Sequence, residues 1–286
     1  MTPLGIVAIL GAILSMLAYG ARKGHSSRSK IQFVVALATW GLLWFATGST
    51  FARDGMMNLP DHMVGHVIVM FVVPMGLVGS ASGRSFWWVM SASSRRRLLR
   101  WWYIGRRRHV STLLANPIVA ALVLNIVMVS AHLPVVFDWV MERTWVMDWV
   151  MEPAFLLSGL FFFHYLVPAV PRKIRVRLRL QLLMVVVTML EMLVMAMSMS
   201  IFTKAAWYSV MYGQPRPMAG MTMTGPVITV AQAFHQQQLA AAILWICGDF
   251  WAVPCLVLIT RRLITRDGSL FAALEGQSAR LSGSAP

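Results

Sequence analysis

The sequence is poor in charged residues, which make up only 12% of its 286 positions, and it has just ten aspartates and glutamates. No long polar stretch is present that could fold as a separate soluble domain. Hydrophobic residues make up 58% of the chain, and the mean hydropathy is +0.68. This composition excludes an ordinary soluble domain and indicates an integral membrane protein.

Catalytic and redox signatures are missing as well. There is no Cys-x-x-Cys pair, glycine-rich phosphate loop or nucleophile–base set, so no enzymatic activity is predicted. The two cysteines, Cys247 and Cys255, lie about 12 Å apart along one helix, too far for a disulfide. The last apolar run has no central lysine, which excludes attachment of retinal. The N-terminus lacks a basic segment, so residues 4–20 are interpreted as a retained span rather than a signal peptide.

Seven apolar runs are long enough to cross a bilayer. They lie near residues 3–21, 31–52, 62–82, 115–137, 147–169, 181–202 and 236–259. Backbone groups in lipid must bond internally, so runs of this length predict helices rather than barrel strands. The expected fold class is all-α: a polytopic membrane protein with seven transmembrane helices in one domain, 1–266, followed by a flexible cytoplasmic tail, 267–286.

Basic residues are concentrated in alternate connections between these runs. Of the 25 lysines and arginines, 21 fall in the segments 22–30, 84–108, 172–179 and 261–280. By the positive-inside rule these segments face the cytoplasm, which places the N-terminus outside and the C-terminus inside. The net charge of +15 therefore reflects orientation and does not indicate nucleic acid. The segment 84–108 is expected to lie on the inner membrane surface, against lipid head groups.

Four of the seven histidines fall at the predicted outer level of the membrane. His62 and His66 begin the third run and share one helix face, about 6 Å apart along the axis. His132 lies near the outer end of the fourth run, Glu152 near the start of the fifth, and His235 just before the seventh. Imidazole is a common metal ligand, so this shared level predicts a site between helices. The alternative is that each histidine simply bonds a neighbouring helix.

Methionine is abundant, with 22 residues, and Met221 and Met223 lie in the outer loop after the sixth run. Thioether and imidazole together favour Cu(I), so copper is the expected metal. The candidate ligands are His62, His66, His132, His235, Glu152, Met221 and Met223. Methionine is also a flexible apolar filler, and this second interpretation stays open for each one. Glu191 and Asp249, near mid-membrane, are interpreted as structural groups or as part of a proton relay.

Several motifs, in their order and spacing, resemble the CtaG family of membrane proteins, which is implicated in cytochrome c oxidase assembly. They are His62-Met63-x-x-His66, Asn116-Pro117, His132-Leu133-Pro134, Glu152, Gly159-Leu160-Phe161, Trp207-Tyr208 and Gln237-Gln238-Leu239-Ala240. The resemblance covers roughly residues 30–260. The chain departs from the family pattern at Pro153, at His235-Gln236 and at Asp249.

The resemblance implies an assembly factor for a haem-copper oxidase in the bacterial inner membrane, with oxidase subunits and lipid as partners. Combined with the outer-face residues, it suggests that the protein holds or positions copper and catalyses no reaction of its own. Two alternatives remain. A copper transport or resistance protein requires polar groups that continue inward from the outer site, and a b-type haem protein requires two axial histidines. A structural oxidase partner without any ligand is also compatible with the sequence, and the oligomeric state is not predicted.

Overall fold

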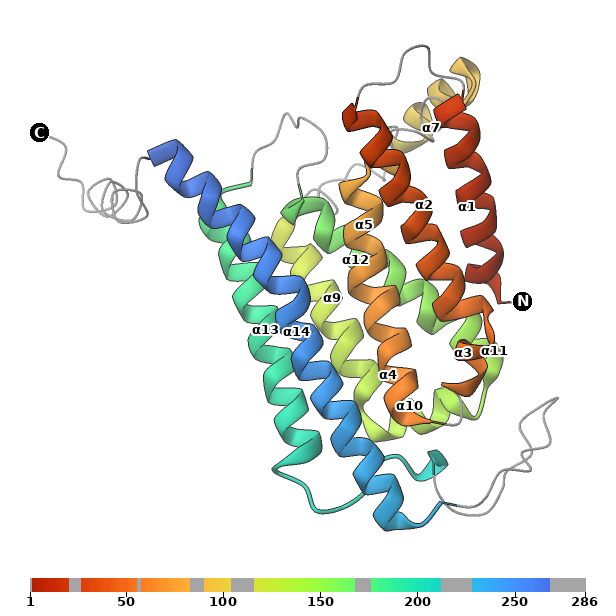
Figure 1. Cartoon of the computed structure of the whole chain (residues 1–286), viewed down its shortest axis with the longest axis vertical. Helices are drawn as coiled ribbons and strands as arrows, with labels where there is room; N and C mark the ends of the chain where they lie inside the picture. The colour runs from red at the N-terminus through yellow and green to blue at the C-terminus, as the bar shows by residue number, and fades with distance from the viewer. Residues whose placement is uncertain are drawn as a thin grey trace, which may run out of the picture.

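The computed structural model describes residues 2–20, 27–55, 58–82, 90–103, 116–167, 176–211 and 228–267, and these are mostly helical with no strand among them. The long helices run side by side as one bundle (Figure 1). Six of them are long and apolar enough to cross a membrane, or seven if one bent pair counts as a single span. The predicted all-α, polytopic fold class is confirmed.

The N-terminal helices α1 (Pro3–Gly20) and α2 (Ser27–Gly48) form one side of the bundle. Their backbones approach closely at Gly5 and Gly48, because a Cβ added to Gly5 would lie 3.3 Å from the Gly48 Cα. Small residues of this kind drive helix association in lipid, where apolar side chains gain little by leaving the hydrocarbon. On the other side, α13 (Leu178–Ser200) packs along the long helix α14 (Val230–Asp267) (Figure 1).

The third span runs through the middle of the bundle in three parts, α4 (Leu59–Val67), the π-helical segment η1 (Ile68–Val72) and α5 (Val73–Gly79). It packs against α2, α12 (Glu152–Leu166) and α14, so apolar neighbours surround it. The contact with α12 is closest at Gly159, where an added Cβ would overlap the Met70 carbonyl oxygen. This central position buries most of the span.

The predicted fourth span, 115–137, is a bent pair rather than one straight helix. Helix α9 (Pro117–His132) and helix α10 (Pro134–Met141) meet at an angle of 74°. Leu133 has an extended backbone, with φ −63° and ψ 129°, as expected for a residue that precedes proline. Pro134 therefore ends α9 just after His132 and turns the chain across the end of the bundle.

The two ends of the bundle differ in character. At one end lie the short helices α3 (Thr50–Asp54), α10 and α11 (Thr144–Val146), whereas α7 (Ala92–Tyr103) lies at the other (Figure 1). Helix α7 belongs to the predicted interfacial segment, and its arginines 96, 97 and 100 are exposed. Residues 268–286 of the predicted tail, and 83–89 and 104–108 of the interfacial segment, lie outside the described residues.

Candidate metal centre

Three histidines from two helices meet inside the bundle at the end where α10 lies. His62 and His66 of α4 face each other with ring centroids 4.1 Å apart, and His66 lies 6.2 Å from His132 of α9. All three are buried, with exposed fractions of 6%, 9% and 5%. The spacing of four residues brings the first two rings to one helix face, and the end of α9 adds the third.

Backbone carbonyls determine the tautomer of two of these rings. The His132 Nδ1 lies 2.7 Å from the Met128 carbonyl oxygen, and the His62 ring is hydrogen-bonded to the Gly55 carbonyl. A carbonyl only accepts, so the bonded ring nitrogen carries the proton. In the neutral rings, Nε2 of His62 and of His132 is therefore unprotonated and carries a lone pair. A ring nitrogen in this state can bind a metal.

The remaining ring nitrogens have no hydrogen-bond partner. Nε2 of His62 and His132, both nitrogens of His66 and Oε2 of Glu152 are buried without one in the described part of the chain. Buried polar atoms are rarely left in this way, since each costs about 1–3 kcal/mol. The unpaired nitrogens of such a cluster are chemically able to bind a ligand.

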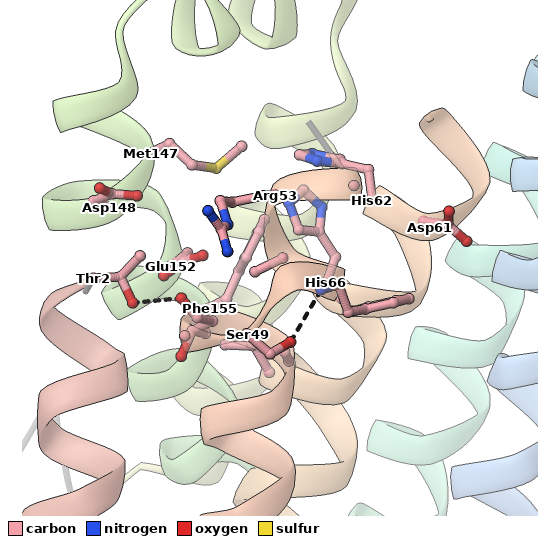
Figure 2. Close-up of a pocket in the computed structure, with 18 of the residues that line it drawn as sticks. Thr2, Ser49, Arg53, Asp61, His62, His66, Met147, Asp148, Glu152 and Phe155 are labelled. Carbon is pink, nitrogen blue, oxygen red and sulfur yellow. Dashed lines mark hydrogen bonds between the residues drawn. The ribbon is translucent and has the colours of Figure 1, made fainter. Parts of the chain in front are cut away.

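A cavity of about 470 Å³ opens beside this cluster. His62, His66 and Phe155 line it from α4 and α12, together with Glu152, and it reaches Thr2 near the N-terminus (Figure 2). Phe155 packs edge-on against His66 with ring centroids 4.6 Å apart, which limits rotation of that imidazole. The cavity therefore adjoins the rings of His62 and His66.

Both π-helical segments of the transmembrane spans adjoin this site. Segment η1 begins two residues after His66, and η2 (Met147–Met151) ends directly before Glu152. A π turn shifts the side chains that follow it relative to a regular helix, and such turns are frequent at functional sites. In the fifth span the turn separates Met147 from Glu152, and both line the cavity.

A polar network closes the end of the bundle next to His132. The Tyr208 hydroxyl donates to the His132 carbonyl oxygen at 3.1 Å, and burial raises the pKa of this phenol, so it remains a donor. Gln237 accepts from the Trp207 amide at 2.7 Å and donates to the Met199 carbonyl at 2.8 Å. The Trp207-Tyr208 and Gln237 motifs thus anchor the connection between α13 and α14, which gives them a structural role.

The predicted ligands divide into three groups. His62, His66 and His132 are brought together, and Glu152 lines the adjoining cavity. His235 is exposed near the start of α14 and does not line it. Met221 and Met223 lie outside the described residues. Among the described residues no three His, Cys, Asp or Glu side chains are placed to hold one metal ion.

Among the other residues that line the cavity, four have a charged or thioether side chain and were not selected from the sequence. They are Met147, Asp148, Asp61 and Arg53. Figure 2 shows Arg53 extending into the space between the helix that carries His62 and His66 and the segment that carries Asp148 and Glu152. Met147 and Asp148 precede Glu152 by about one turn, a spacing that signals a shared face. No such spacing links Arg53 to the other residues, because α3 and α4 are separate helices that come together only in the folded chain.

These features define a polytopic helical membrane protein with an imidazole cluster beside a polar cavity at one end. A family model described as cytochrome c oxidase caa3 assembly factor (Caa3_CtaG) matches residues 14–266, and the chain belongs to this family. The resemblance seen in the sequence is thereby confirmed. A comparison with curated proteins and another with solved structures gave no match.

Proposed function

We propose that this protein binds Cu(I) at His62 and His66 and presents it to a caa3-type cytochrome c oxidase during assembly, as a multi-pass protein of the bacterial inner membrane. The observation that carries this is the set of buried, unpaired imidazole nitrogens beside a cavity. Membership of an oxidase assembly factor family supports an oxidase as the client. The protein acts as a carrier and catalyses no reaction of its own.

The chemistry of the donors supports Cu(I) rather than a hard cation. Neutral imidazole and thioether are soft or borderline ligands, and Met147 lines the cavity together with His62 and His66. Cu(I) accepts two or three ligands, so it does not require the three-residue cluster of His, Cys, Asp and Glu that is absent from the described part of the chain. An ion held by only two or three ligands also suits a carrier, because a ligand from the client protein can bind at a free coordination position.

Two alternative functions fit the geometry less well. Transport across the membrane requires polar groups leading inward, but Glu191, Cys247 and Asp249 do not line the cavity. A b-type haem requires two imidazoles on opposite faces of the porphyrin. His62 and His66, with ring centroids 4.1 Å apart, leave no room for a macrocycle between them.

The test is copper binding by the detergent-purified protein loaded anaerobically with Cu(I), compared with the His62→Ala/His66→Ala double variant. The wild type is expected to retain about one copper per chain, and the double variant to lose most of it. His164→Ala is the matched control, because His164 is an exposed histidine near the other end of α12. It should bind as much copper as the wild type.

Equal copper retention by the wild type and the double variant would exclude this site. In cells, loss of the protein should lower the copper content and activity of the oxidase, and the double variant should fail to restore both. Restoration by the double variant would leave the protein as an assembly scaffold without a copper role.

A further inference from the structure

An aspartate faces outward from the middle of the last transmembrane helix. Asp249 lies at the centre of the apolar part of α14, about 15 Å along the axis from Leu239 and from Ile259. Its side chain is exposed, and it makes no hydrogen bond or ion pair with any residue that the structure describes. Helix α14 lies at the edge of the bundle beside α13 (Figure 1), so this exposed face is turned to the lipid.

The neighbours of Asp249 on the helix surface are large and apolar. Trp245, Ile246, Phe250 and Val253 are exposed by 46%, 67%, 71% and 52%. The opposite face of α14 carries the contacts with the bundle, where the Trp251 indole donates to the Met192 sulfur at 3.4 Å and stacks on Phe71. Asp249 therefore belongs to a separate surface, which no described residue of this chain covers.

A carboxylate at this depth is costly, and such groups almost always face a protein interior, a watery cavity or a partner. Neither of the first two applies, because Asp249 is exposed and does not line the cavity beside His62. The aspartate side chain is too short to reach the interface by snorkelling. The nearest basic residue toward the C-terminus on the same helix, Arg261, is about 18 Å farther along the axis. A basic residue of a partner in the membrane would satisfy the carboxylate.

We propose that the face of α14 formed by Trp245, Ile246, Asp249, Phe250 and Val253 docks a transmembrane helix of another protein that carries a lysine or arginine at mid-depth. We choose a helix with a basic residue because its positive charge complements the Asp249 carboxylate. A second copy of the chain does not supply it, because the described spans carry their basic residues only near their ends. The surface is independent of the copper site, so either proposal can fail without the other.

The test measures association of the full-length protein, labelled and reconstituted in liposomes, with synthetic transmembrane peptides by energy transfer. One peptide has a Leu/Ala core with a single central lysine, and the matched peptide has leucine at that position. The wild type is expected to bind the lysine peptide about tenfold more tightly than the leucine peptide. Asp249→Leu should remove this preference, and Asp249→Lys should transfer it to a peptide with a central aspartate.

Glu191→Gln is the matched control, because Glu191 is a mid-membrane acid of α13 whose Oε2 is buried rather than turned to lipid. It should leave the preference unchanged. Equal binding of the two peptides by the wild type, or an undiminished preference in Asp249→Leu, would overturn the proposal. Cross-linking of a cysteine introduced at Phe250 to a second copy, in a variant lacking the native cysteines, would also overturn it in favour of a homodimer.

Discussion

At the scale of single residues, the site depends on which ring nitrogens are already engaged. The carbonyls of Gly55 and Met128 hold one nitrogen of His62 and one of His132, and the other nitrogen of each ring stays free. Backbone hydrogen bonds of this kind usually orient metal-binding histidines and fix their tautomers. Imidazoles that are oriented in advance in this way would lose less entropy on binding a ligand.

Met147 offers a test at this scale, since it is the thioether that lines the cavity with the histidines. Met147→Leu keeps the volume and removes the sulfur. We expect Cu(I) affinity to fall about tenfold while stability changes by less than about 1.5 kcal/mol. Competition with a chromogenic Cu(I) chelator measures the affinity. Met184→Leu, a buried substitution in α13, is the control, and an equal fall in both variants would deny Met147 a ligand role.

At the scale of elements, a close helix contact holds η1 against α12. Helix α12 packs against η1, and Gly159 lies directly over the Met70 carbonyl and the ring of Pro74. One turn before Gly159, Phe155 contacts His66, so the same contact sets the distance between the histidine helix and the wall of the cavity. The glycine is needed here because any side chain would separate the two spans.

Gly159→Ala should therefore destabilise the protein by about 1–3 kcal/mol, as overpacking of a tight contact does. Thermal denaturation in detergent measures the effect. Gly41→Ala is the control, because a Cβ at Gly41 meets no atom within 4 Å. Its midpoint should stay close to that of the wild type. If the denaturation midpoint of Gly159→Ala equals that of Gly41→Ala, then α12 and the third span can move apart without loss of stability.

At the scale of the whole molecule, the histidine site and the basic helix α7 belong to opposite ends of the bundle (Figure 1). This agrees with a topology in which basic connections lie on one side and the histidine site on the other. Which end faces the cytoplasm stays a prediction from the charge pattern. It decides whether the site can receive copper from the outer side of the membrane.

Cysteine labelling checks this orientation in a variant in which Cys247 and Cys255 are replaced by alanine. A membrane-impermeant thiol reagent added to intact spheroplasts should label Asp54→Cys, which lies at the histidine end. Ser91→Cys, next to α7, should react only after lysis. The reverse pattern would place the histidine site in the cytoplasm and contradict delivery from outside.

The sequence by itself determined the membrane class, the helical fold, the approximate spans and the family, because hydropathy, basic loops and ordered motifs are local properties. It also selected His62, His66 and His132, since depth along a helix can be counted. Only the tertiary structure decided rotation and bending. It turned His235 outward, bent the fourth span at Pro134 and brought Arg53 to the cavity. The physical reason is that which face of a helix meets its neighbours depends on contacts between distant segments, which a nearly uniform apolar run does not encode.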